Sequence, residues 1–174
     1  FQQAEDAFFR GERKFNKHHE FTAKDIRDIH GIWLSKIYEW AGRYRQVPLS
    51  KGGYRFAPPG QIPRLMEELE KNFLTQYTPC ISSSSQDVIK ALAVVHTELI
   101  IIHPFREGNG RVARTLATLM ALQADLPPLD FSLIIKKRKK EYISAVHSGH
   151  VGDYEPMKKI FGLILEKSIS RSRG

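Results

Sequence analysis

The segment that most constrains the fold is residues 87–102, which reads DVIKALAVVHTELIII. Wound as a helix, this segment is apolar on almost every side, so other elements must surround it. His96 and Glu98 interrupt it, and it falls short of the roughly 20 apolar residues that a membrane span needs. We therefore expect a central buried helix inside a globular domain.

The whole chain has the size and composition of one domain. Its 174 residues are enough for a single core, and we treat them as one domain, 1–174, with a core over about 22–165. The formal charge of +8 favours anionic partners such as nucleotides, nucleic acid or acidic protein surfaces. Cys80 is the single cysteine, which indicates a reducing, cytoplasmic compartment. Because the chain opens on Phe1 rather than Met, we expect it to be a piece of a longer one.

Apolar residues recur at helical spacing through most of the remaining sequence. This spacing predicts helices over 26–40, over 62–73, from Asn109 to before Pro127, over 134–146, and after Pro156. Thr22 and Asp25 resemble a capping box at the start of the first helix, and Gly42 would end it. Ser85 would cap the central helix.

Two local patterns refine this helical picture. In 43–55 short apolar–polar alternation surrounds the pair Gly52–Gly53, which predicts a β-hairpin. Ala113, Ala117 and Ala121 are four residues apart and form a smooth ridge that lets a neighbouring helix approach closely. The sequence thus predicts a mostly α domain with one hairpin.

Residues 103–114, HPFREGNGRVAR, place a dense polar cluster between the buried segment and a second apolar one. If a helix begins near Asn109, its first N–H groups lack internal partners and carry the positive end of the helix dipole. Gly108 and Gly110 let an anion approach that backbone. Arg111 and Arg114 are three residues apart, so both can contact an extended polyphosphate.

Two more side chains complete the parts of a phosphate-transfer site. Glu107 precedes the glycines, and an acid beside phosphates is a typical Mg²⁺ ligand. His103 follows the buried segment, where a neutral imidazole can accept a proton from an attacking hydroxyl. A Walker P-loop is excluded, because no Gly-Lys-Ser/Thr follows the glycines. These residues predict nucleotidyl or phosphoryl transfer, with a structural turn and a solvated Arg pair as the plain alternative.

The same residues resemble the signature of the Fic-domain family, His-Pro-Phe-any-Asp/Glu-Gly-Asn-Gly-Arg-any-any-Arg, and fill each of its fixed positions. The resemblance extends over roughly Ile26 to Leu163. The stretch WAGRYRQVPLSKGGYRFAPP from Trp40 is similar to the family's hairpin flap, and GDYEPM from Gly152 is similar to the start of its late helix. The resemblance implies a mostly α, Fic-type helical bundle with one β-hairpin flap over the active site.

The resemblance also implies an activity, that of a protein adenylyltransferase, which moves AMP from ATP to a Ser, Thr or Tyr hydroxyl and releases pyrophosphate. Carried over residue by residue, His103 would deprotonate the hydroxyl, Phe105 would pack inward, and Glu107 would bind Mg²⁺ between the α- and β-phosphates. The remaining signature residues would bind the nucleotide: Gly108, Asn109 and Gly110 as the anion hole, Asn109 also through its amide, Arg111 at the β-phosphate and Arg114 at the γ-phosphate.

Outside the signature, the resemblance assigns two more regions. The flap would hold the target segment by strand-like backbone pairing through Lys51, Gly52, Gly53, Tyr54, Arg55 and Phe56. Tyr142 is expected near the adenine.

Many relatives carry an inhibitory helix, Ser/Thr-any-any-any-Glu-Gly/Asn, whose Glu pairs with the second Arg of the signature. Here only Glu107 precedes a Gly or Asn, and the residue four before it is His103, so these 174 residues lack the pattern. We expect a separate antitoxin-like protein, or a segment upstream of Phe1, to supply that glutamate to Arg114. A toxin–antitoxin pair and an effector secreted into a host cell would both fit.

Residues 136–140, KKRKK, are the other conspicuous feature. They are compatible with nucleic-acid contact, a nuclear address or an acidic docking partner. We favour the solvent face of a helix, whose inward-facing residues would be Ile135, Tyr142, Ile143 and Val146.

Two rival functions stand beside AMP transfer. Some relatives phosphorylate their targets by binding the nucleotide in the opposite sense, but they lack the intact Gly-Asn-Gly-Arg pattern found here. The chain could instead be an inactive basic module that binds nucleotide or nucleic acid, and the complete signature argues against that reading.

Overall fold

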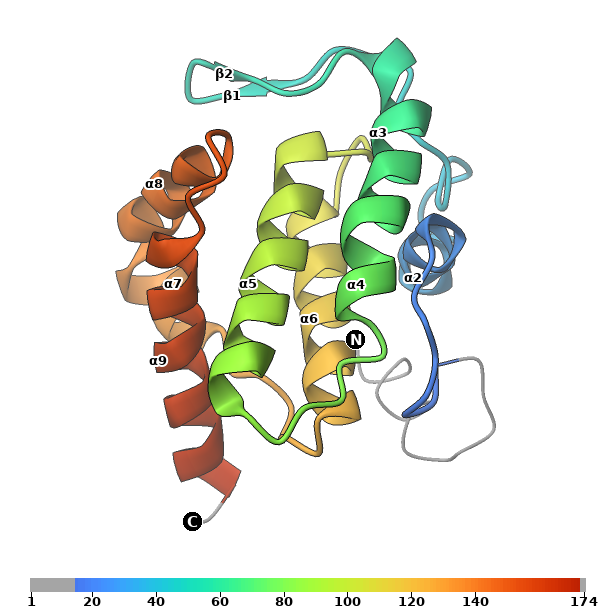
Figure 1. Cartoon of the computed structure of the whole chain (residues 1–174). Helices are drawn as coiled ribbons and strands as arrows, with labels where there is room; N and C mark the ends of the chain where they lie inside the picture. The colour runs from blue at the N-terminus through green and yellow to red at the C-terminus, as the bar shows by residue number, and fades with distance from the viewer. Residues whose placement is uncertain (1–14, 173–174) are drawn as a thin grey trace.

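The computed structural model describes residues 15–172, which form a bundle around the antiparallel pair α5 (Ser85–Ile102) and α6 (Asn109–Gln123) (Figure 1). On one side of this pair lie α2 (Ala23–Leu34), α3 (Ile62–Leu69), the π-helical turn η2 (Glu70–Leu74) and α4 (Thr75–Tyr77). On the other side lie α7 (Ser132–Lys137), α8 (Lys139–Gly149) and α9 (Glu155–Ser172). The expected fold class, mostly α with one hairpin, is confirmed.

The central helix pair explains where the polar loop comes to lie. α5 is buried along most of its length, as its composition predicts, and the ridge of Ala113, Ala117 and Ala121 on α6 is at most 2% exposed. Small buried side chains on this ridge let the neighbouring helices approach α6 closely. Because the two helices are antiparallel, the end of α5 and the start of α6 face the same end of the bundle, joined by residues 103–108.

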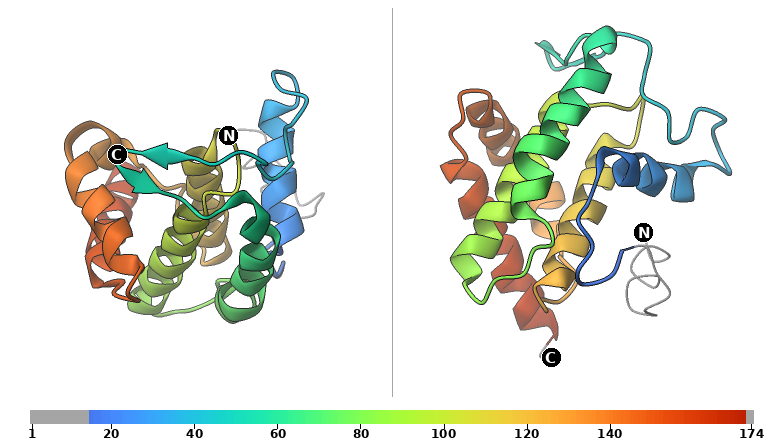
Figure 2. Two further views of the ribbon diagram at one scale, coloured as in Figure 1. Left: turned by 90° about the horizontal axis from the view of Figure 1, so that it is seen from above. Right: turned by 45° about the vertical axis from the view of Figure 1, so that its right-hand side comes forward.

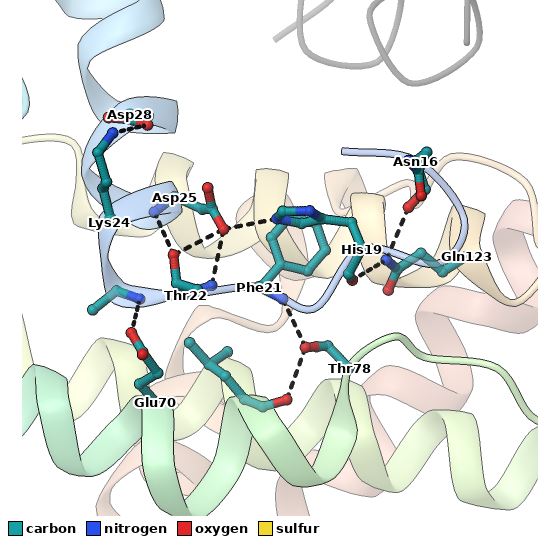
Figure 3. Close-up of polar contacts among 12 residues, drawn as sticks. Asn16, His19, Phe21, Thr22, Lys24, Asp25, Asp28, Glu70, Thr78 and Gln123 are labelled. Carbon is teal, nitrogen blue, oxygen red and sulfur yellow. Dashed lines mark hydrogen bonds and ion pairs between the residues drawn. The ribbon is translucent and has the colours of Figure 1, made fainter. Parts of the chain in front are cut away.

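The expected capping box at the start of α2 is present (Figure 3). Asp25 N donates to Thr22 Oγ1 at 3.2 Å, and Thr22 N donates to Asp25 Oδ2 at 3.0 Å. The Ala23 N–H donates to Glu70 Oε2 at 2.7 Å. The Phe21 N–H donates to Thr78 Oγ1 at 2.9 Å. These bonds fasten α2 to the layer that contains α3, η2 and α4.

The first predicted helix is shorter than its apolar spacing suggests, because α2 ends at Leu34 instead of continuing to Trp40. The following turns fold back on α2, where Gly42 adopts a positive φ of 76° and accepts a hydrogen bond from Arg27 Nε at 2.8 Å. Ile37, one of the residues that suggested a longer helix, is 66% exposed. Tyr38 and Trp40 instead stack on each other, with ring centroids 4.4 Å apart.

Two other local predictions are corrected. The cap of α5 is Ser84, whose hydroxyl accepts from the Asp87 N–H, so Ser85 is the first helical residue. The single helix predicted over 134–146 is two helices, α7 and α8, separated at Arg138. Arg138 lies between them with a non-helical φ of −121° and pairs with Glu141 at 3.2 Å.

The break also changes which side chains face inward. Val146 is buried and Tyr142 is half-buried, as predicted. Ile135 and Ile143 are 56% and 43% exposed, and Ile134 is the buried residue of α7.

The hairpin consists of β1 (Ser50–Lys51) and β2 (Tyr54–Arg55), followed by the short 3₁₀ turn η1 (Pro59–Gln61). Gly52 and Gly53 have φ values of 58° and 81°, which are the left-handed positions of a two-residue hairpin turn. The hairpin is confirmed, although residues 43–49 before it are not strand. It extends above the end of α5 toward α8 (Figure 2). Among residues 15–172 no helix is long and apolar enough to cross a membrane.

Candidate active site

His103 ends α5 in the left-handed region, with φ 52° and ψ 59°. Its Nδ1 lies 3.1 Å from the Ile100 carbonyl oxygen. A carbonyl can only accept, so Nδ1 carries the ring proton and Nε2 keeps its lone pair. Burial, with smaller contributions from the cations of Arg45 and Lys51, lowers the pKa of His103 to about 4. The side chain is therefore a neutral imidazole at pH 7 with a nitrogen available to accept a proton.

Arg45 joins this histidine to both ends of the flap. Its side chain is 1% exposed, and it donates Nε to the His103 carbonyl at 2.8 Å. Its two terminal nitrogens donate to the carbonyls of Val47 at 2.9 Å and Ala57 at 2.6 Å. The Arg45 N–H also donates to the Pro104 carbonyl at 2.9 Å. One buried guanidinium thus fixes the backbone before, after and beneath the hairpin.

His30 on α2 holds the other half of the loop. Its Nδ1 accepts from the Gly42 N–H at 2.8 Å, so Nε2 carries the proton and donates to the Glu107 carbonyl at 3.0 Å. Burial lowers the pKa of His30 and keeps it neutral. Its ring stacks on Phe105, with centroids 3.9 Å apart, and Phe105 is fully buried. The inward packing expected of Phe105 is present in the structure.

The side chain of Asn109 bonds the backbone of Phe105 in the middle of the loop. Its Oδ1 accepts from the Phe105 N–H and its Nδ2 donates to the Phe105 carbonyl, both at 2.8 Å. The Phe105 carbonyl takes one of the two Nδ2 hydrogens, so the side-chain amide keeps one donor beside the backbone N–H groups at the start of α6. Gly108 has a φ of 84°, and a Cβ there would lie 3.2 Å from Leu34 Cδ1 and 3.3 Å from Trp33. The positive φ makes any other residue strained here, and a Cβ would also push the side chains of Leu34 and Trp33 aside.

The start of α6 is flanked by two guanidinium groups. Arg111 lies over the ring of Trp33, 4.9 Å from its centroid. Arg114 folds back along the helix, since a Cβ on Gly110 would lie 3.2 Å from one of its terminal nitrogens. Neither arginine forms an ion pair with a carboxylate in the described part of the chain, 15–172. Two unneutralised cations beside unpaired helix N–H groups can bind a polyphosphate.

Glu107 is exposed beside this helix start, and its Oε2 accepts from the Tyr38 hydroxyl at 3.3 Å. Within residues 15–172 no cluster of three or more His, Cys, Asp or Glu side chains could hold a metal alone. Mg²⁺ usually takes one or two carboxylates and completes its shell with phosphate oxygens and water. A single carboxylate next to a helix start that can bind phosphate fits this pattern.

Tyr142 lies on α8 rather than in the loop. Its hydroxyl lies 2.8 Å from Nε2 of His96, whose other nitrogen, Nδ1, faces the Ala113 carbonyl at 3.3 Å. Burial raises the pKa of Tyr142, and the guanidinium of Arg114 opposes that shift. The structure therefore holds the Tyr142 hydroxyl against the buried ring of His96.

The flap lies directly against the histidine. The ring of Phe56 stacks on the ring of His103, with centroids 3.7 Å apart and an interplanar angle of 12°. Tyr54 packs on His147 and His150 at the end of α8, and its hydroxyl bonds the His150 ring. Lys51 and Arg55 are exposed on the hairpin. The flap and the signature loop are in contact through Phe56.

Sequence reasoning did not identify His30 or Arg45. His30 lies at a core position of a helix, and nothing in the neighbouring sequence indicates that it bonds Glu107, 77 residues away. Arg45 is one of three arginines in 43–55, and nothing in that alternation marks it as buried. Both act through contacts distant in sequence, which local patterns do not encode.

Comparisons with known proteins place the chain in a family. A model of the Fic/DOC family matches residues 20–121, which include 103–114. The chain is 28% identical over 159 residues to the protein adenylyltransferase fic-1 of Caenorhabditis briggsae, covering 91% of this chain and 30% of that protein. It is 28% identical over 151 residues to the protein adenylyltransferase Fic of Drosophila ananassae, covering 86% and 29%. The chain thus spans less than a third of the length of these curated relatives.

Solved structures show the same fold. The BepC effector protein of Bartonella tribocorum, with bound AMPPNP, aligns with a TM-score of 0.69 at 28% identity, covering 94% of this chain and 80% of that one. The N-terminal Fic domain of a cell filamentation protein from Bartonella quintana aligns with a TM-score of 0.71 at 31% identity, covering 94% and 77%. By sequence and by fold, this chain belongs to the Fic/DOC family.

Proposed function

We propose that this chain is a protein adenylyltransferase, which transfers AMP from ATP to a hydroxyl of a target protein. One observation carries the proposal: the proton-accepting histidine His103 and the arginine-flanked start of α6 lie at the two ends of one short loop. The relatives named protein adenylyltransferase and the AMPPNP in the Bartonella tribocorum structure support it.

The reaction follows from the protonation state of His103. Its Nε2 takes the proton of the target hydroxyl as that oxygen attacks the α-phosphorus of ATP. The bond between the α-phosphorus and the bridging oxygen to the β-phosphate breaks, and pyrophosphate leaves with the electron pair. The ring of Phe56 covers the face of the imidazole, while the Nε2 lone pair lies in the ring plane. Stacking therefore leaves that lone pair available for the proton.

The start of α6 supplies the charge stabilisation. Backbone N–H groups of Gly108, Asn109 and Gly110 would bind the α-phosphate oxygens, where negative charge develops. Arg111 and Arg114 would bind the β- and γ-phosphates and stabilise the leaving pyrophosphate. Glu107 would hold Mg²⁺, which neutralises charge on the phosphates when bound. Tyr142 would lie toward the adenine.

The flap would hold the target. Each strand of a two-stranded ribbon has one unpaired edge, and an extended segment can add to it through backbone hydrogen bonds. Residues Lys51 to Phe56 would place such a segment beside His103, because the ring of Phe56 stacks on the His103 ring. Backbone pairing tolerates varied side chains, which suits an enzyme that must present a hydroxyl from a flexible segment.

Labelled ATP tests this function directly. Incubation with α-³²P-ATP, Mg²⁺ and cell lysate should label a protein band or the chain itself, and His103→Ala should reduce the label by about 10²- to 10⁴-fold. A His103→Ala protein with an unchanged melting temperature shows that the loss is chemical. Label from γ-³²P-ATP in place of α-³²P-ATP would instead establish a kinase, and an undiminished biological effect of His103→Ala would establish a binding module.

Regulation through Arg114 is part of the same proposal. Burial lowers the pKa of this guanidinium, which has no carboxylate partner in 15–172. A glutamate from an antitoxin-like protein, or from a segment outside these 174 residues, would pair with it and displace the γ-phosphate. A longer form of the protein, or a co-expressed inhibitor, should then be less active than this chain, and Arg114→Ala should not respond to that inhibitor. Equal activity of this chain, of a longer form and of the chain with a co-expressed inhibitor would contradict regulation through Arg114.

The compartment is a proposal too. The Bartonella relatives are VirB-translocated effector proteins. We propose that this chain acts in a cytoplasm, either that of the producing cell or, as an effector, that of a host.

A further inference from the structure

A cavity of about 360 Å³ lies beneath the C-terminal half of the flap, on the side of α5 that faces α3 and η2. Tyr54 and Phe56 form its upper wall. Leu65 and Phe73 form the side that α3 and η2 contribute, and Ile101 on the last turn of α5 forms its floor. None of the signature residues from His103 to Arg114 lines it. The cavity is therefore separate from the proposed nucleotide site.

The cavity is nevertheless adjacent to the reaction centre. Phe56 lines it and also stacks on His103, with centroids 3.7 Å apart. The lining residues of the flap are Tyr54 and those after it, so the cavity opens along β2 and the segment that follows. A chain segment held at β2 would therefore pass over the cavity close to the point where its hydroxyl meets His103.

One wall of the cavity carries a half-buried carboxylate that is not used in the proposed mechanism. Oε1 of Glu98 accepts from the Tyr154 hydroxyl at 2.5 Å, whereas Oε2 has no hydrogen-bond or ionic partner among residues 15–172. Burial raises the pKa of the Glu98 carboxyl, and the Tyr154 hydrogen bond opposes that shift. A poorly solvated anion with one unused oxygen is stabilised by a cation that brings its own hydrogen-bond donors.

The other charged groups at the cavity do not meet this need. Arg55 is exposed on the rim and forms no ion pair with Glu98. The ring of His150 is bonded to Tyr54. Glu68 adds a second carboxylate, which pairs with Arg64. In a chain with a net charge of +8, this cavity combines apolar walls with one carboxylate oxygen that has no partner among residues 15–172, which is the chemistry that receives an aliphatic cation.

We infer that this cavity binds a lysine or arginine side chain of the target segment, with its aliphatic stem between Leu65, Phe73 and Ile101 and its charged end at Glu98. The inference rests on the proposed function, because it assigns the cavity to a neighbour of the modified hydroxyl. Backbone pairing at the flap selects no particular target sequence, and the cavity would add a preference for a basic side chain. The site would select targets with a basic residue close to the modified Ser, Thr or Tyr.

A binding measurement tests the cavity without any enzymatic activity. The chain, labelled at Ile, Leu and Val methyl groups, is titrated with hexylammonium and, separately, with hexanol, and followed by NMR. Hexylammonium should shift the methyl signals of Ile101 and Leu65 and leave the buried core residue Leu116 unchanged. Glu98→Gln keeps an acceptor for Tyr154 and should weaken hexylammonium binding at least about tenfold, since a charge-assisted hydrogen bond is lost. Glu166→Gln, an exposed acid on α9, is the matched control.

Two results would overturn the cation site. One is equal affinity for hexanol and hexylammonium, which would make the cavity merely apolar. The other is unchanged hexylammonium binding in Glu98→Gln.

A peptide library then links the cavity to target choice. Peptides with a fixed central Tyr, Ser or Thr and randomised flanks are incubated with α-³²P-ATP. We expect Lys and Arg to be enriched about tenfold at one flanking position by the wild-type chain and not by Glu98→Gln. Labelling without this preference overturns the specificity role and leaves AMP transfer intact. Absence of label from every peptide and every lysate protein overturns AMP transfer, while the hexylammonium titration still reports on the cavity.

Discussion

The loop of residues 103–109 and the flap of residues 50–56 both contact the reaction centre, but they are held in different ways. Buried side chains bond the loop's backbone from inside: His30 at Glu107, Arg45 at His103 and Asn109 at Phe105. The flap tip is held by a ladder of two residue pairs and by ring contacts of Tyr54 and Phe56. Its base, in contrast, shares Arg45 with the loop.

This difference matches two different tasks. Charge stabilisation works best when the donors are fixed before the reaction, so that no free energy is used to orient them. A surface that grips the backbone of another chain must instead adjust to it. We therefore expect substitutions that disturb the anchoring of the loop to cost more activity and more stability than substitutions at the flap tip.

Arg45→Lys should cause the largest loss, because it affects the loop and the base of the flap together. A lysine ammonium cannot reach the three carbonyls that the guanidinium bonds, and each buried carbonyl left without a donor costs about 1–3 kcal/mol. We expect the free energy of unfolding to fall by about 3 kcal/mol, measured by urea titration. Label incorporation should fall by about 100-fold, as a small displacement of catalytic groups can cause.

Arg43→Lys is the matched control for this prediction, since Arg43 is exposed two residues earlier. It should change neither quantity measurably. Equal effects at the two positions would mean that the buried bonds of Arg45 do not set the loop.

His30→Phe should have a smaller effect that is confined to the loop. Phenylalanine keeps the ring stack on Phe105 but leaves the Gly42 N–H and the Glu107 carbonyl without partners. We expect a loss of about 2 kcal/mol in unfolding free energy. Label incorporation should fall about tenfold, with most of the change in the KM for ATP, because Glu107 and Gly108 shift with the loop. An unchanged KM would assign His30 to stability alone, and His18→Phe, at an exposed position, provides the control.

The pH profile tests how closely the flap covers the histidine. His103 is active when neutral, so activity is lost as the pH falls through its pKa of about 4. kcat/KM should therefore change less than about twofold between pH 7.5 and 5.5, whereas a histidine with the ordinary pKa near 6.5 would lose about tenfold. Phe56→Ala removes the stacked ring, raises the pKa of His103 and should bring the profile toward that fall. An inflection near pH 6.5 in the wild-type chain would contradict the burial argument.

The same contrast explains what could be predicted from the sequence. α5, α6 and the turn at Gly52–Gly53 follow local rules of periodicity and backbone conformation, and the structure has them where expected. The signature residues are contiguous, so their placement on one loop and the first turns of α6 was predictable. The end of α2 at Leu34 could not be predicted. The apolar residues after it keep helical spacing in the sequence, but Tyr38 and Trp40 stack on each other in a turn. His30 and Arg45 were missed because the loop residues that they bond, Glu107 and His103, lie far away in sequence.

Tyr54→Phe should cause the smallest change, because it removes only the hydroxyl that bonds His150 and keeps the ring between His147, His150 and Phe56. One hydrogen bond at a half-exposed position contributes about 0.5–1 kcal/mol. We expect a two- to fivefold rise in the KM for the target, with the KM for ATP and the melting temperature unchanged, in a steady-state assay of label incorporation. This selective change would separate the flap tip from the loop: the tip determines how the target is held, and the loop determines how fast it is modified. An equal loss in kcat would show that the tip is as much a part of the fixed catalytic frame as His30 and Arg45.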